Sequence, residues 1–230
     1  MAIVSEQLLG ALADRALSFV REDTIVGLGS GRAATAFVKS LGARVGQGLR
    51  ITGVPTSDAT AALARSVGIP LVGLDAGDLD IAVDGADEVA PNLDLVKGWG
   101  GALVRERIVA MAARRRVILV DSEKLVDRLG RRGRVPVEVL PFATAFCQRK
   151  LSALGCRPAL RMADGRPFVS DNWNVILDCA LDPIDDPRAL ERAIRAIPGV
   201  IDTGLFLDVA DTVLVWDGGV VRALERKEPR

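Results

Sequence analysis

The chain contains no histidine and no tyrosine among its 230 residues. Without histidine, the sequence excludes zinc sites that need imidazole ligands, Ser-His-Asp triads and phosphohistidine chemistry. Any acid–base chemistry must therefore use carboxylate, lysine or cysteine side chains. This absence restricts the possible functions more than any other feature of the composition.

Cysteine is also scarce, with Cys147, Cys156 and Cys179 as the only three. They form no CxxC pair, and any pairing among them leaves one thiol over. This pattern is typical of reduced, mostly buried thiols in a cytoplasmic protein.

Neither sign of charge is in excess, because thirty basic residues balance thirty acidic ones. A nucleic-acid-binding surface would require a basic excess, so we expect no nucleic-acid partner. No apolar run reaches the roughly 18 residues that a membrane helix requires. The first residues lack the basic start and the unbroken apolar run of a signal peptide. We therefore expect neither a membrane partner nor a secretory leader.

The length and an apolar content of 49% allow one large domain or two modest ones. Short apolar runs alternate with segments of helical periodicity in the first half. The predicted strands are Thr24–Leu28, Leu49–Val54, Ile69–Leu74, Ile81–Val83 and Val117–Val120. The predicted helices cover 5–20, Ala33–Leu41, Ala61–Val67 and 102–115. This alternation implies right-handed crossovers and a largely parallel sheet covered on both faces.

A basic, glycine-punctuated segment, Arg128–Arg134, marks a change of composition. The elements predicted beyond it follow the order βαββαβ, a ferredoxin-like unit. They are Val135–Leu140, Thr144–Leu154, Arg157–Arg161, Asn174–Cys179, Pro187–Ile197 and Val200–Phe206. A last hairpin, 212–223, is expected to return to the first domain. We thus predict an α/β domain of residues 1–130 plus 207–230 and a smaller α+β domain of residues 131–206.

Polar clusters follow four of the predicted strands directly. They are GSGR at 29–32, TSDAT at 56–60, DGADE at 84–88 and DSEK at 121–124. In open α/β sheets, ligands bind beyond the carboxyl ends of the strands. The four clusters therefore predict a binding site at that edge of the sheet.

The first cluster favours a small phosphate over a dinucleotide. The dinucleotide fingerprint requires a third glycine where Arg32 stands. Ser30 and Arg32 would add a hydroxyl and a cation to the N–H groups of the next helix. The alternative is a tight turn whose glycines serve packing alone. For 56–60, a helix N-cap with surplus hydroxyls is the favoured interpretation.

The acidic cluster leaves more than one interpretation open. Asp84 and Asp87 could bind Mg²⁺ or sugar hydroxyls, while a phosphatase of the haloacid-dehalogenase type would require Asp-x-Asp spacing. A turn-forming aspartate before Gly85 explains one of the two, but not the second together with Glu88.

A lysine and a glutamate follow the acidic cluster. Lys97 precedes the loop 98–101, and the lysine with helix-end N–H groups would stabilise an enediolate or a phosphate. The alternative is a plain loop with a solvated lysine. Glu106 could merely cover a helix face, although the absence of histidine favours a carboxylate as the base. A glutamate with a pKa of about 4.3 is a weak base, so burial would have to raise that pKa.

These motifs together closely resemble type A ribose-5-phosphate isomerase. The runs VDGADE and KGWGGALVRE carry most of the resemblance, with GLGSG, PTSDAT and VDSEK beside them. The segments VPVEVLPFA, NVILD and AIPGVIDTGLF occur in the order of that family. The resemblance extends from about Ile25 to Trp216.

The resemblance implies an enzyme of the pentose phosphate pathway that interconverts ribose 5-phosphate and ribulose 5-phosphate. It implies no metal and no organic cofactor, a cytoplasmic location, and a homodimer or homotetramer. The implied fold is a Rossmann-like domain with a smaller α+β domain, which agrees with the elements predicted above.

The resemblance also implies roles for particular residues. Glu106 matches the general base that takes the proton from C2, and Asp84, Asp87 and Lys97 match the groups for ring opening and the enediolate. The implied substrate and phosphate contacts are Ser30, Gly31, Arg32, Ala33, Gly85, Ala86, Gly98, Trp99, Gly100 and Lys124.

Five positions differ from the pattern of the family. Its phosphate loop usually reads Gly-Thr-Gly-Ser-Thr, whereas 29–33 reads GSGRA and so loses two hydroxyls and gains a guanidinium. Trp99 occupies a position that is often glycine, and Glu123 one that is usually serine. Arg32, Trp99 and Glu123 suggest one alternative, an isomerase of another sugar phosphate. A non-catalytic module that binds a sugar phosphate is a second alternative. An acyl-CoA transferase is disfavoured because its glutamate context does not match VDGADE.

Overall fold

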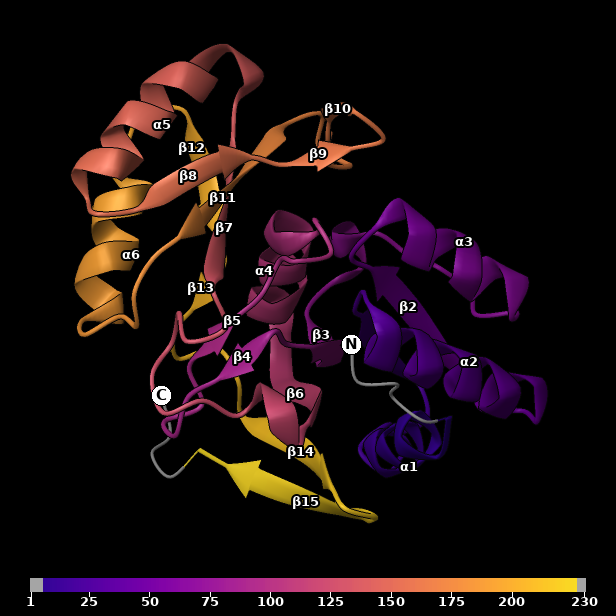
Figure 1. The fold of residues 1–230 in the computed structure, drawn as a ribbon. Helices are drawn as coiled ribbons and strands as arrows, with labels where there is room; N and C mark the ends of the chain where they lie inside the picture. Colours follow the sequence, from indigo (N-terminus) through magenta and orange to yellow (C-terminus); the bar gives the residue numbers. More distant parts are fainter. Residues whose placement is uncertain (1–5, 227–230) are drawn as a thin grey trace. The chain divides into compact units, whose positions relative to one another are not determined.

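The computed structural model describes residues 6–226, which divide into two compact units (Figure 1). Among the described residues, the first unit comprises 6–86, 105–124 and 209–226. The second unit comprises Asp87–Val104 and Leu125–Asp208. The chain therefore passes from the first unit to the second and back twice.

The first unit is built on a six-stranded sheet in the order β15-β14-β6-β3-β1-β2. Five strands are parallel to their neighbours, and β15 pairs antiparallel with β14. The strands are β1 (Thr24–Leu28), β2 (Ile51–Pro55), β3 (Leu79–Gly85), β6 (Ala113–Asp121), β14 (Thr212–Asp217) and β15 (Val220–Glu225). The C-terminal hairpin thus extends this sheet, as predicted.

Helices cover both faces of this sheet. They are α1 (Glu6–Leu17), α2 (Arg32–Gly46), α3 (Asp58–Ser66) and α4 (Leu103–Ala112). On one face, Val26 and Leu28 of β1 join the apolar cluster that contains Phe37 of α2 and residues of α1. On the other face, Ala82 of β3 packs with Val109 of α4. Because both faces are buried, the strands read as unbroken apolar runs instead of alternating ones.

The second unit contains an antiparallel sheet in the order β12-β7-β11-β8. Its elements are β7 (Arg134–Val139), α5 (Thr144–Ala153), β8 (Arg157–Leu160), β11 (Val175–Ala180), α6 (Pro187–Arg195) and β12 (Val200–Thr203). The predicted βαββαβ order is confirmed, with a short hairpin of β9 (Met162–Ala163) and β10 (Arg166–Pro167) inserted after β8. The predicted fold class, a Rossmann-like domain with a smaller ferredoxin-like one, is confirmed as well.

A small three-stranded sheet completes the second unit. It consists of β4 (Glu88–Val89), β5 (Leu95–Val96) and β13 (Leu205–Phe206), with β5 in the middle. Residues 87–104 therefore belong to the second unit, whereas the sequence assigned them to the first domain. The physical reason is that β5 pairs with β13, and Val96 shares an apolar cluster with Val135 and Leu205.

Three predicted elements are wrong in part. The predicted strand Val200–Phe206 is divided into β12 and β13, which belong to different sheets. Segment 69–74 forms no strand but a single bridge from Leu71 to Gly53, followed by the 3₁₀ turn Leu74–Ala76. Pro70 lacks the N–H group that a longer ladder would need. Helix α4 ends at Ala112 instead of 115, because the arginines that follow pair with β3 as the start of β6.

No helix within residues 6–226 has the length and apolar character needed to cross a membrane.

Gly27 in β1 lies close against Val109 of α4. A Cβ atom there would lie 2.6 Å from Val109 Cγ1 and 2.9 Å from Ala82 Cβ. We expect Gly27→Ala to lower the free energy of unfolding by about 1–3 kcal/mol through overpacking. Urea denaturation measures this difference.

Gly10 in α1 provides the matched control, because a Cβ atom there meets nothing within 4 Å. Gly10→Ala should raise the free energy of unfolding by about 0.5–1 kcal/mol through helix propensity. Equal effects of the two substitutions would contradict the packing described for β1 and α4.

Candidate active site

The four polar clusters follow four neighbouring strands of the first unit's sheet. β1 lies between β2 and β3, and β3 lies beside β6, all in parallel. Their carboxyl ends therefore share one edge. The chain continues from β1 to β2 on one side and from β3 to β6 on the other, so the order reverses between β1 and β3. Ligands of open α/β sheets bind at such a switch point.

Asp84 occupies this switch point at the end of β3. Its Oδ1 atom accepts hydrogen bonds from the Ser30 amide (3.0 Å) and the Gly85 amide (2.7 Å), and the residue is only 7% exposed. The backbone of Gly29 passes directly over it, since a Cβ atom at Gly29 would lie 2.3 Å from Asp84 Oδ1. Glycine at 29 is therefore required for the carboxylate and the loop to approach each other.

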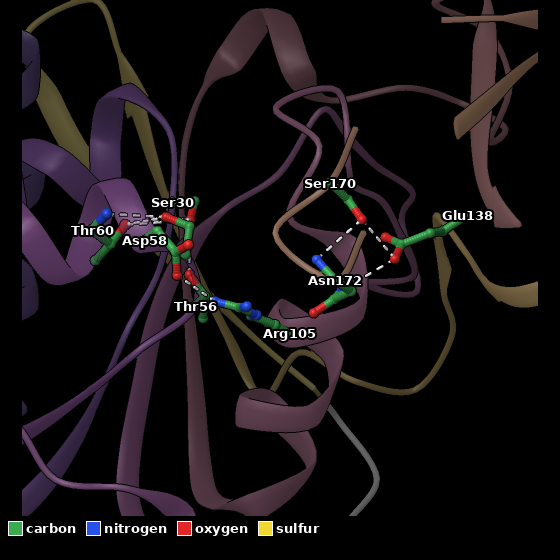
Figure 2. A network of polar contacts seen from close by, with 9 residues as sticks. Ser30, Thr56, Asp58, Thr60, Arg105, Glu138, Ser170 and Asn172 are labelled. Atoms are coloured by element: carbon green, nitrogen blue, oxygen red, sulfur yellow. Dashed lines mark hydrogen bonds and ion pairs between the residues drawn. The ribbon is translucent and has the colours of Figure 1, made fainter. Parts of the chain in front are cut away.

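The hydroxyl of Ser30 belongs to a cluster of hydroxyl groups at the start of α3 (Figure 2). Ser30 Oγ lies 2.8 Å from Thr56 Oγ1, 3.0 Å from Ser57 Oγ and 3.3 Å from Thr60 Oγ1. Ser57 also caps α3 by accepting from the Thr60 amide, so the predicted N-cap is confirmed. The cluster joins the loops after β1 and β2, which the sequence did not predict.

Helix α2 begins at Arg32, directly after this loop. Gly31 has a φ of 86°, a left-handed conformation that favours glycine, and no side chain caps the helix. The first N–H groups of α2 are therefore suited to an anion. Arg32 is exposed and Ala33 is half-buried beside them. This geometry is compatible with the predicted phosphate contacts.

Glu106 lies in the first turn of α4 and is buried, with 5% exposure. Its neighbour Arg105 forms an ion pair of 2.7 Å with Asp58 in the first turn of α3 (Figure 2). Because Glu106 is buried, it does not cover a solvent-exposed helix face, and that alternative interpretation is wrong. A buried carboxylate at this position is suited to proton transfer.

The last cluster of the first unit follows β6. Lys124 is half-buried at the end of the 3₁₀ turn Ser122–Lys124, and Glu123 is exposed. Asp121, the last residue of β6, has a buried Oδ1 atom with no hydrogen-bond partner among the described residues. Buried polar atoms are normally hydrogen-bonded, so this oxygen is suited to a ligand or a water molecule. Asp121 was not singled out from the sequence.

The second unit holds the lysine loop. Lys97 is 4% exposed, and its Nζ atom lies 5.6 Å from the centroid of the Phe206 ring. Its amide donates to the carbonyl of Gly204. Gly98 and Gly101 have φ values of 97° and 91°, so the loop requires glycine at both. The alternative of a solvated lysine on a plain loop is wrong.

The two remaining acidic residues of the DGADE run lie in the second unit and differ in role. Asp87 Oδ2 accepts a hydrogen bond of 3.0 Å from the Trp99 amide. Glu88 is fully buried and accepts from the amides of Gly130 and Arg132. Glu88 thus organises the Arg128–Arg134 segment, which explains its presence without a ligand. Burial raises the pKa of Glu88, and the two backbone N–H groups oppose that rise only in part.

The predicted site residues are divided between the two units. The first unit holds Ser30, Gly31, Arg32, Ala33, Asp84, Gly85, Ala86, Glu106 and Lys124. The second unit holds Asp87, Lys97, Gly98, Trp99 and Gly100. Within residues 6–226, no three cysteine or acidic side chains are grouped so that they could hold a metal ion.

A Rossmann-like sheet edge with a buried glutamate, a hydroxyl cluster and a helix N-terminus is typical of enzymes that perform acid–base chemistry on a small anionic ligand. The family model of ribose 5-phosphate isomerase A (phosphoriboisomerase A) matches residues 52–218. The chain belongs to this family.

Curated relatives match the chain over most of its length. The ribose-5-phosphate isomerase A of Thermomicrobium roseum is 55% identical over 92% of this chain and 90% of its own. That of Sphingopyxis alaskensis is 47% identical, with 98% of both chains covered.

Solved structures agree with these matches. Ribose 5-phosphate isomerase A from Methanocaldococcus jannaschii superposes with a TM-score of 0.91 at 40% identity, over 96% of this chain and 99% of that chain. A D-ribose-5-phosphate isomerase in complex with phospho-erythronic acid has a TM-score of 0.93 at 42% identity, with the same coverage.

The raised pKa of Glu88 predicts a pH-dependent contribution to stability. A carboxyl whose folded-state pKa exceeds its unfolded value contributes stability below the unfolded pKa, and this contribution is lost as pH rises through the folded pKa. Glu88→Gln removes the ionisation and also places an amide donor against backbone donors. Its destabilisation should therefore be larger near pH 4 than near pH 7, as measured by urea denaturation.

Glu123→Gln is the control, because Glu123 is exposed. Its effect on stability should be small at both pH values. A cost of Glu88→Gln that grows with rising pH would contradict the assigned direction of the pKa shift.

Proposed function

We propose that this protein interconverts D-ribose 5-phosphate and D-ribulose 5-phosphate through an enediolate. The observation that carries the proposal is its membership of the ribose 5-phosphate isomerase A family, with 55% identity to one relative over 92% of the chain. The burial of Glu106 and Lys97 supports it, because both side chains are kept from bulk solvent.

The phosphate is bound by the first N–H groups of α2 and by Ser30, Arg32 and Lys124. The helix N-terminus favours an anion, and the two cations add charge. The hydroxyl cluster around Ser30 Oγ fixes the loop in the conformation in which its amides are presented. Arg32 takes the place of the lost hydroxyl groups as a phosphate ligand.

The reaction transfers one proton between carbons and another between oxygens. Asp84 and Asp87 bind the sugar, and Asp84 handles the proton during ring opening. The carboxylate of Glu106 takes the proton from C2, which leaves an enediolate, and returns it to C1. The proton of the C2 hydroxyl moves to O1, so that aldose and ketose have the same composition. Glu106 thus ends each turnover in its starting state.

Lys97 and the amides of the glycine loop stabilise the enediolate. Preorganised charges and N–H donors in a site without bulk water stabilise developing negative charge more strongly than water does. A relative was solved in complex with phospho-erythronic acid, a phosphorylated aldonic acid. Its carboxylate has two oxygens in a plane, like the two oxygens of an enediolate, so such a ligand is suited to this site.

Turnover of several sugar phosphates tests the substrate assignment. Ribose 5-phosphate should have the highest kcat/KM when it is compared with arabinose 5-phosphate, glucose 6-phosphate and allose 6-phosphate. Preference for another aldose phosphate would favour the second interpretation, an isomerase of different specificity, for which Arg32 and Trp99 are the distinguishing residues. Binding without turnover of any of them would indicate a non-catalytic module.

The enzyme acts in the pentose phosphate pathway in the cytoplasm, as a homodimer or homotetramer. The pathway, the cellular location and the oligomeric state are parts of the proposal that rest on the resemblance of the motifs to the family.

Glu106→Gln should lower kcat by about three to five orders of magnitude, because the amide cannot accept the C2 proton. The Kd of ribose 5-phosphate should change little, since the substitution keeps the shape of the side chain. Isomerase kinetics and calorimetric titration measure the two quantities. Glu191→Gln on α6 is the matched control and should leave both unchanged. A nearly normal rate in Glu106→Gln would remove Glu106 from the role of base.

Turnover should persist after prolonged treatment with a chelator, because the proposed chemistry uses carboxylates and a lysine without a metal ion. The rate is measured before and after dialysis against EDTA, and again after addition of Mg²⁺. Loss of activity that Mg²⁺ restores would favour the metal-binding interpretation of Asp84 and Asp87.

A further inference from the structure

The lysine loop of the second unit contains three glycines, Gly98, Gly100 and Gly101, among its five residues. Glycine loses more conformational freedom on ordering than any other residue, so such a loop does not hold one conformation by itself. Lys97 is nevertheless buried at the start of the loop. An interaction from outside the loop is needed to fix its backbone.

Arg161, directly after β8, provides that interaction. Its Nη1 atom donates to the carbonyl of Gly98 and to the carbonyl of Trp99, each at 3.1 Å. The side chain is 10% exposed, so these bonds are shielded from water. Its guanidinium also lies 5.7 Å from the Phe168 ring, against which Gly101 packs so closely that a Cβ atom there would lie 2.5 Å away.

Asp178 on β11 holds the guanidinium in place. Arg161 donates from Nε to one carboxylate oxygen (3.0 Å) and from Nη2 to the other (2.6 Å), a two-pronged geometry that only arginine can form. Asp178 is 11% exposed. The guanidinium therefore has one orientation, in which its Nη1 nitrogen points at the loop carbonyls.

Arg134 on β7 also interacts with the carboxylate of Asp178, and it links that carboxylate to Trp99. Its Nη1 atom lies 3.3 Å from Asp178 Oδ2, and its guanidinium lies 5.2 Å from the centroid of the Trp99 ring. The Trp99 indole donates to the Arg134 carbonyl at 3.1 Å. The tryptophan thus fastens the loop to β7 by its side chain, while Arg161 holds the loop by its backbone.

We propose that Arg161, oriented by Asp178, is a positioning residue that fixes the Lys97–Gly101 loop and thereby the place of the Lys97 side chain, with Trp99 and Arg134 as a supporting arm. The catalytic consequence rests on the proposed function, in which Lys97 stabilises the enediolate. A displacement of about 1 Å in a catalytic group costs roughly a hundredfold in rate. The effect should therefore fall on kcat, while substrate binding through the first unit's phosphate loop is kept.

The test compares Arg161→Lys and Arg161→Gln with the control Arg157→Gln, on the adjoining strand β8, where Arg157 forms a solvent-exposed ion pair with Asp182. Isomerase kinetics and amide hydrogen exchange of residues 97–104 are measured on each full-length variant. We expect kcat to fall about tenfold to a hundredfold in Arg161→Lys and further in Arg161→Gln, with KM within about threefold of the wild type. Loop exchange should be faster in both, and Arg157→Gln should match the wild type.

Arg134→Gln provides a second variant if Arg161→Gln does not fold. The Arg134 side chain is more exposed than that of Arg161, so its replacement should disturb folding less. It should produce a smaller loss of kcat and faster loop exchange. An unchanged kcat in folded Arg161→Lys, or unchanged loop exchange, would overturn the proposal. If the wild-type protein had no turnover, the proposed function would be contradicted, but the positioning role of Arg161 would not. Hydrogen exchange of the loop in the Arg161 variants would then test that role.

Discussion

The carboxylates in the short run Asp84–Glu88 accept hydrogen bonds from backbone N–H groups of separate loops. The positions of the polar residues at the candidate site depend on these hydrogen bonds. Asp84 binds the amide of Ser30 in the first unit. In the second unit, Asp87 binds the amide of Trp99, and Glu88 binds those of Gly130 and Arg132. Charge-assisted hydrogen bonds of this kind are roughly twice as strong as neutral ones. One stretch of sequence therefore orders the loop after β1, the lysine loop and the basic segment.

Glycines make these interactions possible, because each carboxylate must approach the main chain of a loop. Gly29 lies so close to Asp84 that no side chain fits, and Gly98 and Gly101 adopt backbone conformations that favour glycine. The same freedom makes the lysine loop dependent on contacts from outside, which Arg161 and the carbonyl of Arg134 supply. Acidic residues and glycines thus occur together in the sequence for one physical reason. The carboxylates hold the loop backbones by hydrogen bonds, and the glycines let those backbones come close enough.

Local signals predicted much of this structure. Apolar runs predicted the parallel strands, and the βαββαβ order predicted the second sheet. A helix N-cap was predicted within 56–60, and the structure assigns it to Ser57. Segment 69–74 failed as a strand because Pro70 cannot donate, and α4 ended early because strand pairing with β3 outweighed helical periodicity. The contact of Arg161 with Gly98 spans 63 positions, and neither spacing nor composition indicates it. The role of Glu88 likewise depends on amides more than forty positions away.

The central claim is that this protein moves a proton between C1 and C2 of a pentose phosphate through an enediolate. Incubation with ribose 5-phosphate in D₂O, followed by NMR, tests it most directly. The account predicts that ribulose 5-phosphate forms and that deuterium from the solvent enters at C1, because the proton held by Glu106 can exchange before it is returned. Tight binding of ribose 5-phosphate with neither ribulose 5-phosphate nor deuterium incorporation would contradict the account.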